Sequence, residues 1–174
     1  MPNRDYRKYP TKSLTIEDAK KADIVIEAAV ENMEVKQTIF KQLDVLAPKH
    51  TILATNTSSL PITEIAAVTK RPEKVIGMHF MNPVPVMKLV EIIRGLATTD
   101  EVYEAVAEMT KLLGKTGVEV NDFPGFISNR ILLPMINEAI YALYEGIGFC
   151  AAGIYSFLLE RGEFLRPLRR PSQE

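Results

Sequence analysis

The segment HFMNPVPVMKLVEI (79–92) holds a histidine and a glutamate in an arrangement that suits proton transfer. His79 stands at the carboxyl end of one predicted strand, and Glu91 lies on the next. An imidazole titrates near neutral pH, and a carboxylate beside it fixes its tautomer and favours its charged form. The pair would then act as a general base. Alternatively, His79 is a satisfied, half-buried histidine and Glu91 a surface charge, although burial of Glu91 within its apolar run would require a partner.

A second polar segment, ATNTSS (54–59), comes directly after another predicted strand. In open α/β sheets, ligands bind at the carboxyl ends of the strands, so a cofactor or substrate would lie beside these side chains. A different interpretation is that Ser58 or Ser59 caps a helix beginning near Pro61. The sequence position favours neither interpretation.

Two smaller groups accompany these segments. Glu31, Asn32 and Lys36 follow the first predicted strand and reach the same edge of the sheet, unless they form only a solvated charged turn. In DFPGFISNR (122–130), Asn129 falls in the first turns of a long predicted helix that could face the α/β unit. On its own, Asn129 could equally be a local polar residue.

Strands and helices alternate over the part of the chain that carries most of these residues. Apolar runs predict strands at 22–30, 51–55, 75–80, 87–93 and 117–122, the first of them buried on both faces. Amphipathic helices are predicted at 35–47, 59–69 and 100–114. This alternation indicates the α/β class, with a mostly parallel sheet between layers of helix.

Finer features of the helices can also be predicted. The helix at 35–47 would turn one apolar face to the core, formed by Val35, Ile39, Leu43 and Leu46. In the helix at 100–114, Asp100 would cap the start and Gly114 would end it.

The chain changes character at Asp122–Pro124, where we expect a domain boundary. The stretch 125–146 predicts one long helix, with a kink or break at Pro134. We therefore expect a disordered basic N-terminus (1–13), an α/β domain (14–122), the start of an all-α region (123–160) and a disordered tail (161–174).

The composition excludes several classes of protein. The 21 basic and 22 acidic residues give a net charge of −1, without the basic excess of a dedicated nucleic-acid binder. A single cysteine, Cys150, indicates a reducing, intracellular location. No cluster of side chains at metal-ligand spacing is visible, so we expect no metal. The apolar run 147–159 is shorter than a membrane span, so we expect no membrane insertion.

Together, five segments in this order resemble the 3-hydroxyacyl-CoA dehydrogenase family, particularly its 3-hydroxybutyryl-CoA branch. They are VIEAAVEN, ATNTSSLPITEIA, GMHFMNPVPVMKLVEIIRG, LGKTGVEVND and PGFISNRILLPMINEA. The resemblance runs from about Asp23 to about Gly146. It implies a partial Rossmann-type NAD-binding domain followed by a truncated all-α region for substrate binding and dimerisation.

The resemblance also implies a reaction, the NAD-dependent interconversion of (S)-3-hydroxyacyl-CoA and 3-oxoacyl-CoA in fatty-acid or butanoate metabolism. His79 would take the proton of the substrate 3-hydroxyl while a hydride leaves C3 for NAD. Glu91 would orient His79, and Ser58 and Asn129 would hydrogen-bond the substrate oxygens.

The cofactor and the partners are implied in the same way. NAD would contact the family positions occupied here by Glu31, Lys36, Ser58 and Asn82. The remaining expectations are an acyl-CoA thioester substrate, a cytoplasmic enzyme, and a homodimer if the C-terminal region packs.

Two departures from the family matter. No glycine precedes Gly77, so the Gly-rich turn that would hold the pyrophosphate of NAD is absent from the sequence. The string 146–151 fits G-x-G-x-x-A, but a predicted helix precedes it where the motif requires a strand. The stretch 147–174 resembles nothing in the family.

These departures leave two other hypotheses open. The chain could be a truncated, non-catalytic remnant or interaction module with the same fold. It could also be a dehydrogenase for small hydroxy acids, although NPVPVMKLVE and PGFISNR favour acyl-CoA.

Overall fold

The computed structural model of the chain describes residues 15–146. The expectations for 1–13, 161–174, Cys150 and the string at 146–151 lie wholly or largely outside that range. The chain divides into two compact units, Met1–Ile127 and Ser128–Glu174. The division falls close to the boundary expected at Asp122–Pro124.

Within residues 15–127, five strands form one sheet in the order β1-β2-β3-β4-β5. The strands are β1 (Ile24–Glu27), β2 (Ile52–Thr55), β3 (Val75–Phe80), β4 (Leu89–Arg94) and β5 (Thr116–Asn121). Neighbouring strands run parallel, except that β3 and β4 are antiparallel. This arrangement confirms the predicted α/β class with a mostly parallel sheet.

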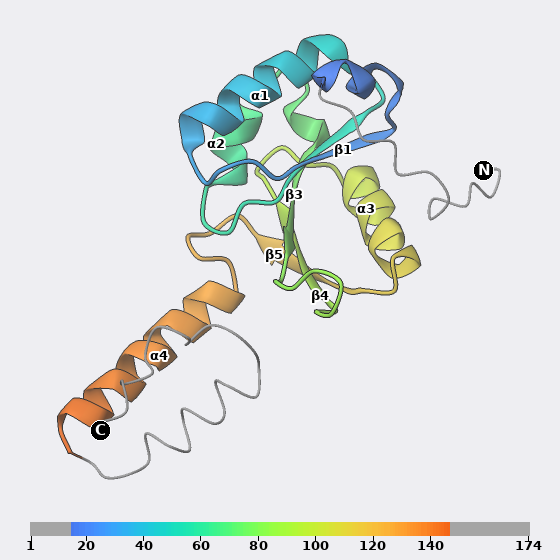
Figure 1. Cartoon of the computed structure of the whole chain (residues 1–174). Coiled ribbons are helices and arrows are strands. Elements are labelled where there is room, and N and C mark those ends of the chain that lie inside the picture. The colour runs from blue at the N-terminus through green and yellow to red at the C-terminus, as the bar shows by residue number, and fades with distance from the viewer. Residues whose placement is uncertain (1–14, 147–174) are drawn as a thin grey trace. The chain divides into compact units, whose positions relative to one another are not determined.

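Helices cover both faces of this sheet (Figure 1). Helices α1 (Met33–Leu46) and α2 (Ile62–Ala66) lie on one face, and α3 (Asp100–Leu112) lies on the other. Two short 3₁₀ helices, Ile16–Lys21 and Pro72–Lys74, complete the unit.

Adjacent residues of the strands point to opposite faces and feed two separate cores. Leu53 and Ile93 pack with α1 and α2, whereas Ala54 and Ile92 pack with α3. The sheet is therefore buried on both sides at its centre, as a layered α/β unit requires.

The buried face of α1 differs from the predicted one. Lys36, Phe40 and Leu43 are buried, while Val35 is 39% exposed. Sequence hydropathy alone places Lys36 on the polar side, so the predicted face is rotated by about one residue. The reason is an ion pair, described below, that satisfies the Lys36 ammonium inside the unit.

Two further predictions need correction. The strand predicted at 22–30 is only Ile24–Glu27, and it is not buried on both faces, because it lies at an edge of the sheet and Ile26 is 39% exposed. Asp100 does not cap α3: Thr99 is the N-cap residue, and Asp100 pairs with Arg94.

Gly114 follows the end of α3 with a φ of +72°, a left-handed conformation that glycine adopts without strain. This confirms the predicted end of the helix.

The second unit contains α4, which runs from Ser128 to Tyr144. Pro134 lies inside this helix without ending it, so of the predicted kink or break the break does not occur. Several large apolar side chains of α4 are exposed, among them Ile131, Leu133 and Leu143. Within residues 15–146, no helix combines the length and the apolar character needed to cross a membrane.

Candidate active site

The antiparallel pairing of β3 and β4 sets His79 directly opposite Glu91. Oε2 of Glu91 lies 2.7 Å from Nδ1 of the imidazole. Both side chains are buried, with His79 7% and Glu91 1% exposed. The surface-charge interpretation of Glu91 is therefore wrong, and the partner that its burial requires is the imidazole.

A turn just before the end of the first unit completes the surroundings of this pair. The backbone N–H of Ile127 donates to Oε1 of Glu91 over 3.0 Å, so both carboxylate oxygens have partners. The buried ring of Phe126 lies 6.0 Å from the His79 ring, centroid to centroid. Phe126 has a φ of +50°, and Gly125 before it has a φ of +80°. This left-handed turn directs the Ile127 N–H toward Glu91.

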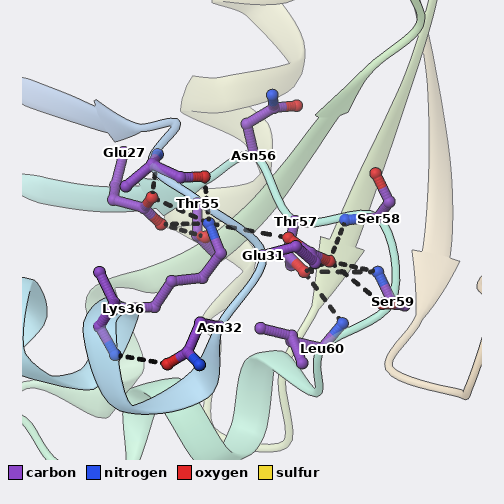
Figure 2. Close-up of polar contacts among 12 residues, drawn as sticks. Glu27, Glu31, Asn32, Lys36, Thr55, Asn56, Thr57, Ser58, Ser59 and Leu60 are labelled. Carbon is purple, nitrogen blue, oxygen red and sulfur yellow. Dashed lines mark hydrogen bonds and ion pairs between the residues drawn. The ribbon is translucent and has the colours of Figure 1, made fainter.

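A second group forms where β1 and β2 end (Figure 2). Oε1 of Glu31 accepts hydrogen bonds from the Thr57 hydroxyl at 2.6 Å and from the backbone N–H groups of Ser58 at 2.9 Å and Ser59 at 3.0 Å. The Ser59 hydroxyl also donates to this oxygen, over 3.1 Å. Glu31 therefore fixes the loop that carries Ser58, because its carboxylate accepts hydrogen bonds from three consecutive residues of that loop.

The electrostatics of Glu31 follow from these contacts. Partial burial favours the neutral acid, but the hydrogen bonds from Thr57, Ser58 and Ser59 favour the carboxylate more strongly. Together they hold the pKa of Glu31 below its ordinary value of 4.5. The side chain is charged at neutral pH.

A buried ion pair lies next to Glu31 (Figure 2). Nζ of Lys36 lies 2.9 Å and 3.0 Å from the two oxygens of Glu27. Glu27 also accepts from the Thr55 hydroxyl at 2.7 Å and from the backbone N–H of Ala29. The Lys36 side chain is fully buried, and its ammonium is 3.8 Å from Oε2 of Glu31. Lys36 thus links the end of β1 to the loop that holds Glu31.

The remaining residues at this edge follow β2 and β3. Oδ1 of Asn56 accepts the backbone N–H of Phe80 over 2.9 Å, which ties the end of β2 to the end of β3. Asn82 comes two residues after β3, and its side chain is exposed. Because β1, β2 and β3 are parallel, the loops bearing Glu31, Ser58 and Asn82 share one edge of the sheet.

The capping interpretation of Ser58 and Ser59 is not what the structure shows. The backbone N–H groups of Ile62 and Thr63, at the start of α2, donate to the carboxylate of Asp122 at 2.9 Å and 2.7 Å. The cap of α2 thus comes from a residue just past β5. The exposed Ser58 side chain stands at the carboxyl end of β2.

Asn129, the fourth predicted catalytic residue, lies in the first turn of α4 and belongs to the second compact unit. The structure brings His79 and Glu91 together, and it brings Glu31, Lys36 and the Ser58 loop together. In residues 15–146, no group of three or more His, Cys, Asp or Glu side chains could hold a metal ion.

Sequence reasoning missed four contributors to the site, namely Glu27, Thr55, Phe126 and the backbone of Ile127. One signal was available for Glu27. A glutamate inside the apolar run IVIEAAV demands a buried partner, and Lys36 stands nine positions later. Nothing in the residue pattern indicates the left-handed turn at Phe126, which depends on tertiary packing.

Comparison with known proteins gives a consistent result. The profile of the family described as "3-hydroxyacyl-CoA dehydrogenase, NAD binding domain" matches residues 5–123. The chain is 70% identical over 135 residues to a probable 3-hydroxybutyryl-CoA dehydrogenase of Bacillus subtilis (strain 168), covering 78% of this chain and 47% of that protein. It is 56% identical over 131 residues to a 3-hydroxybutyryl-CoA dehydrogenase of Clostridioides difficile, covering 75% and 47%.

A solved structure of a similarly named protein is also similar to this chain. The crystal structure of (S)-3-hydroxybutyryl-CoA dehydrogenase from Ralstonia eutropha has a TM-score of 0.76 and 54% identity, covering 78% of this chain and 48% of that one. The chain therefore spans about half the length of the relatives it matches.

Proposed function

The chain belongs to the 3-hydroxyacyl-CoA dehydrogenase family, and from this premise we propose that it interconverts (S)-3-hydroxyacyl-CoA and 3-oxoacyl-CoA with NAD. The observation that carries the proposal is the buried His79–Glu91 pair, 2.7 Å apart on neighbouring strands. The names of the relatives support an acyl-CoA thioester as substrate. Fatty-acid or butanoate metabolism is the corresponding context.

The His79–Glu91 pair suits one proton transfer. Glu91 binds Nδ1 of His79, which leaves Nε2 as the nitrogen that takes the proton of the substrate 3-hydroxyl. The positive charge then formed on the imidazole lies against the Glu91 carboxylate, which stabilises it. The Ile127 N–H holds the other oxygen of Glu91, so the carboxylate keeps its orientation throughout.

The edge formed by β1, β2 and β3 is where we propose that NAD binds. The donors and acceptors there fit the polar nicotinamide end of a dinucleotide: the exposed side chains of Glu31, Ser58 and Asn82 project from loops that follow three parallel strands. Bound NAD supplies the hydride acceptor for C3 of the substrate.

Two of the remaining roles are also proposals. Ser58 and Asn129 hydrogen-bond the substrate oxygens and hold C3 toward the cofactor. Lys36, whose ammonium is fully buried against Glu27, contributes by keeping Glu31 in place.

Turnover with matched histidine variants tests the proposal. The assay is NADH oxidation with acetoacetyl-CoA by the whole chain. His79→Gln should lower the rate by a factor of about 10² to 10⁴, the usual contribution of a positioned general base. His50→Gln is the control, because His50 is the other histidine of the sequence and its side chain is 65% exposed. Equal rates for His79→Gln and the wild type would refute the role of His79.

A second candidate function is a non-catalytic module with the same fold. The given sequence spans about half the length of its relatives, so experiment on the chain itself must separate the two proposals. Failure of the folded chain to bind NADH or to oxidise it would favour that module, whereas saturable NADH binding would exclude it.

We further propose that the protein is a cytoplasmic homodimer that buries the exposed apolar side chains of α4. Replacing Ile131 and Leu143, both more than half exposed, with Asp should yield monomers in light scattering if α4 forms the dimer contact. A dimer that survives both replacements would place the contact elsewhere.

A further inference from the structure

A lysine that lies outside the loop joining β3 to β4, residues 81–88, forms hydrogen bonds to that loop. This lysine has no role in the site described above. Nζ of Lys115 donates to the backbone carbonyl of Val84 over 2.6 Å and to that of Met87 over 2.8 Å. The residues that these bonds join lie about 30 positions apart in the sequence. The bonds hold the segment LGKTG (113–117), to which no role has been given above, against the loop that carries Asn82.

The loop itself offers few donors for its own carbonyl groups. It contains Pro83 and Pro85, which have no backbone N–H. Its internal hydrogen bonds are a narrow turn in which the N–H groups of Val86 and Met87 both donate to the carbonyl of Pro83 at 3.0 Å. A donor from another element is therefore needed to fix the Val84 and Met87 carbonyls.

Lys115 is well placed to be that donor because its own backbone is fixed on both sides. Gly114, with its φ of +72°, ends the helical segment before it. Thr116 after it opens β5, pairs with Leu89 of β4, and donates its N–H to the carbonyl of Lys88 over 2.8 Å. The ammonium thus starts from a rigid point beside the end of the loop, and its hydrogen bonds are charge-assisted.

We propose that Lys115 is a positioning residue that anchors the 81–88 loop and thereby holds Asn82 where it contacts NAD. The second half of this statement rests on the proposed function. The first half concerns the loop alone and can be tested without any ligand.

The test compares three variants of the full 174-residue chain with the wild type. Lys115→Met removes the positive charge and the hydrogen-bond donors but keeps a long side chain, whereas Lys115→Arg keeps the charge and the donors. Lys111→Met is the control, since Lys111 is an exposed lysine in the last turn of α3. Circular dichroism establishes that each variant is folded.

Amide hydrogen exchange, followed by NMR without cofactor, reads the loop directly. Lys115→Met should speed exchange at Val86 and Met87 about tenfold or more, because hydrogen bonds to a charged group contribute at least that factor to an equilibrium. Lys115→Arg should restore much of the protection, and Lys111→Met should leave it unchanged. Exchange at Phe40 in α1 should stay constant throughout. Unchanged exchange at Val86 and Met87 in Lys115→Met would overturn the proposal.

NADH titration, followed by the emission of NADH itself, reads the consequence for the cofactor. We expect Lys115→Met to raise the Kd about tenfold, in line with the loss of loop order, and Lys111→Met to leave it unchanged. A wild-type Kd in Lys115→Met, despite faster loop exchange, would overturn the link to Asn82. If the wild type does not bind NADH, the proposed function fails, while the exchange data still decide the anchoring role of Lys115.

Discussion

The buried Glu27–Lys36 pair leads to a prediction in which one substitution has opposite effects in two backgrounds. Glu27→Gln should destabilise the wild type, because it removes the carboxylate that is bonded to the buried Lys36 ammonium and leaves only the more distant Glu31 carboxylate, 3.8 Å away, as countercharge. In a chain that already carries Lys36→Met, the same Glu27→Gln should be stabilising, because it removes a carboxylate that has lost its partner.

The magnitudes follow from the burial and the contacts. The side chains of Lys36 and Glu27 are 0% and 3% exposed, and two N–O distances of 2.9 Å and 3.0 Å join them. Removing one partner of such a pair costs about 3–5 kcal/mol of unfolding free energy. In the double variant the amide oxygen introduced by Glu27→Gln can still accept from the Ala29 N–H, while its NH2 group can donate to the Thr55 hydroxyl, which then acts as acceptor. That variant should therefore lie within about 2 kcal/mol of the wild type.

Urea unfolding of the four proteins measures these differences. The chain contains no tryptophan, so far-UV circular dichroism is the appropriate signal. A domain of ordinary stability, about 5–15 kcal/mol, can lose this much and remain folded in water. If Glu27→Gln lowers the unfolding free energy by the same amount in both backgrounds, the two charges are not coupled and the reasoning from the buried pair is refuted.

Three further predictions concern the rest of the fold. Gly77→Ala in β3 should cost about 1–3 kcal/mol, because its Cβ would stand 2.9 Å from Cβ of Ile93; an unchanged urea midpoint would contradict this. Asp122→Ala should lower the free energy of unfolding by about 1 kcal/mol, because α2 loses the carboxylate that caps its start. Asp122→Asn should lower it less, so equal losses measured in urea would argue against capping. The pKa of Glu31 lies below 4.5 in the folded chain, so the hydrogen bonds to its carboxylate stabilise the fold fully above pH 4.5. This stabilisation is lost as the pH falls through the lowered pKa of the folded chain. An NMR titration midpoint of the Glu31 carboxyl carbon above 4.5 would disprove this.

The layered architecture was predictable from the sequence because it depends on short-range patterns. The five apolar runs and the amphipathic stretches place the five strands and the three α-helices between them to within a few residues, but they do not indicate the two 3₁₀ helices. The end of α3 at Gly114 was predictable for the same reason, since glycine adopts a left-handed conformation at low cost. Asp100 was mistaken for a cap because the neighbouring Thr99 is an equally suitable residue type.

The site was predictable only in part, because its contacts join residues that are distant in sequence. The residue types at positions 79 and 91 indicated a base and a carboxylate, but their contact depends on the register of two antiparallel strands. The burial of Lys36 could not be read from hydropathy, since its satisfaction depends on Glu27. The roles of Phe126 and Asp122 likewise arise only when the end of β5 packs against other elements.

The antiparallel pairing of β3 and β4 puts the imidazole and the carboxylate on the sheet itself. His79 and Glu91 are held by the hydrogen-bonded backbones of two central strands, whereas Ser58, Asn82 and Glu31 lie on loops. Loop sequences can therefore diverge, lengthen or exchange without moving His79, the proposed proton acceptor. Among descendants of such a chain, we expect changes of substrate to come from substitutions in the loops, while the two strands keep the same facing residues.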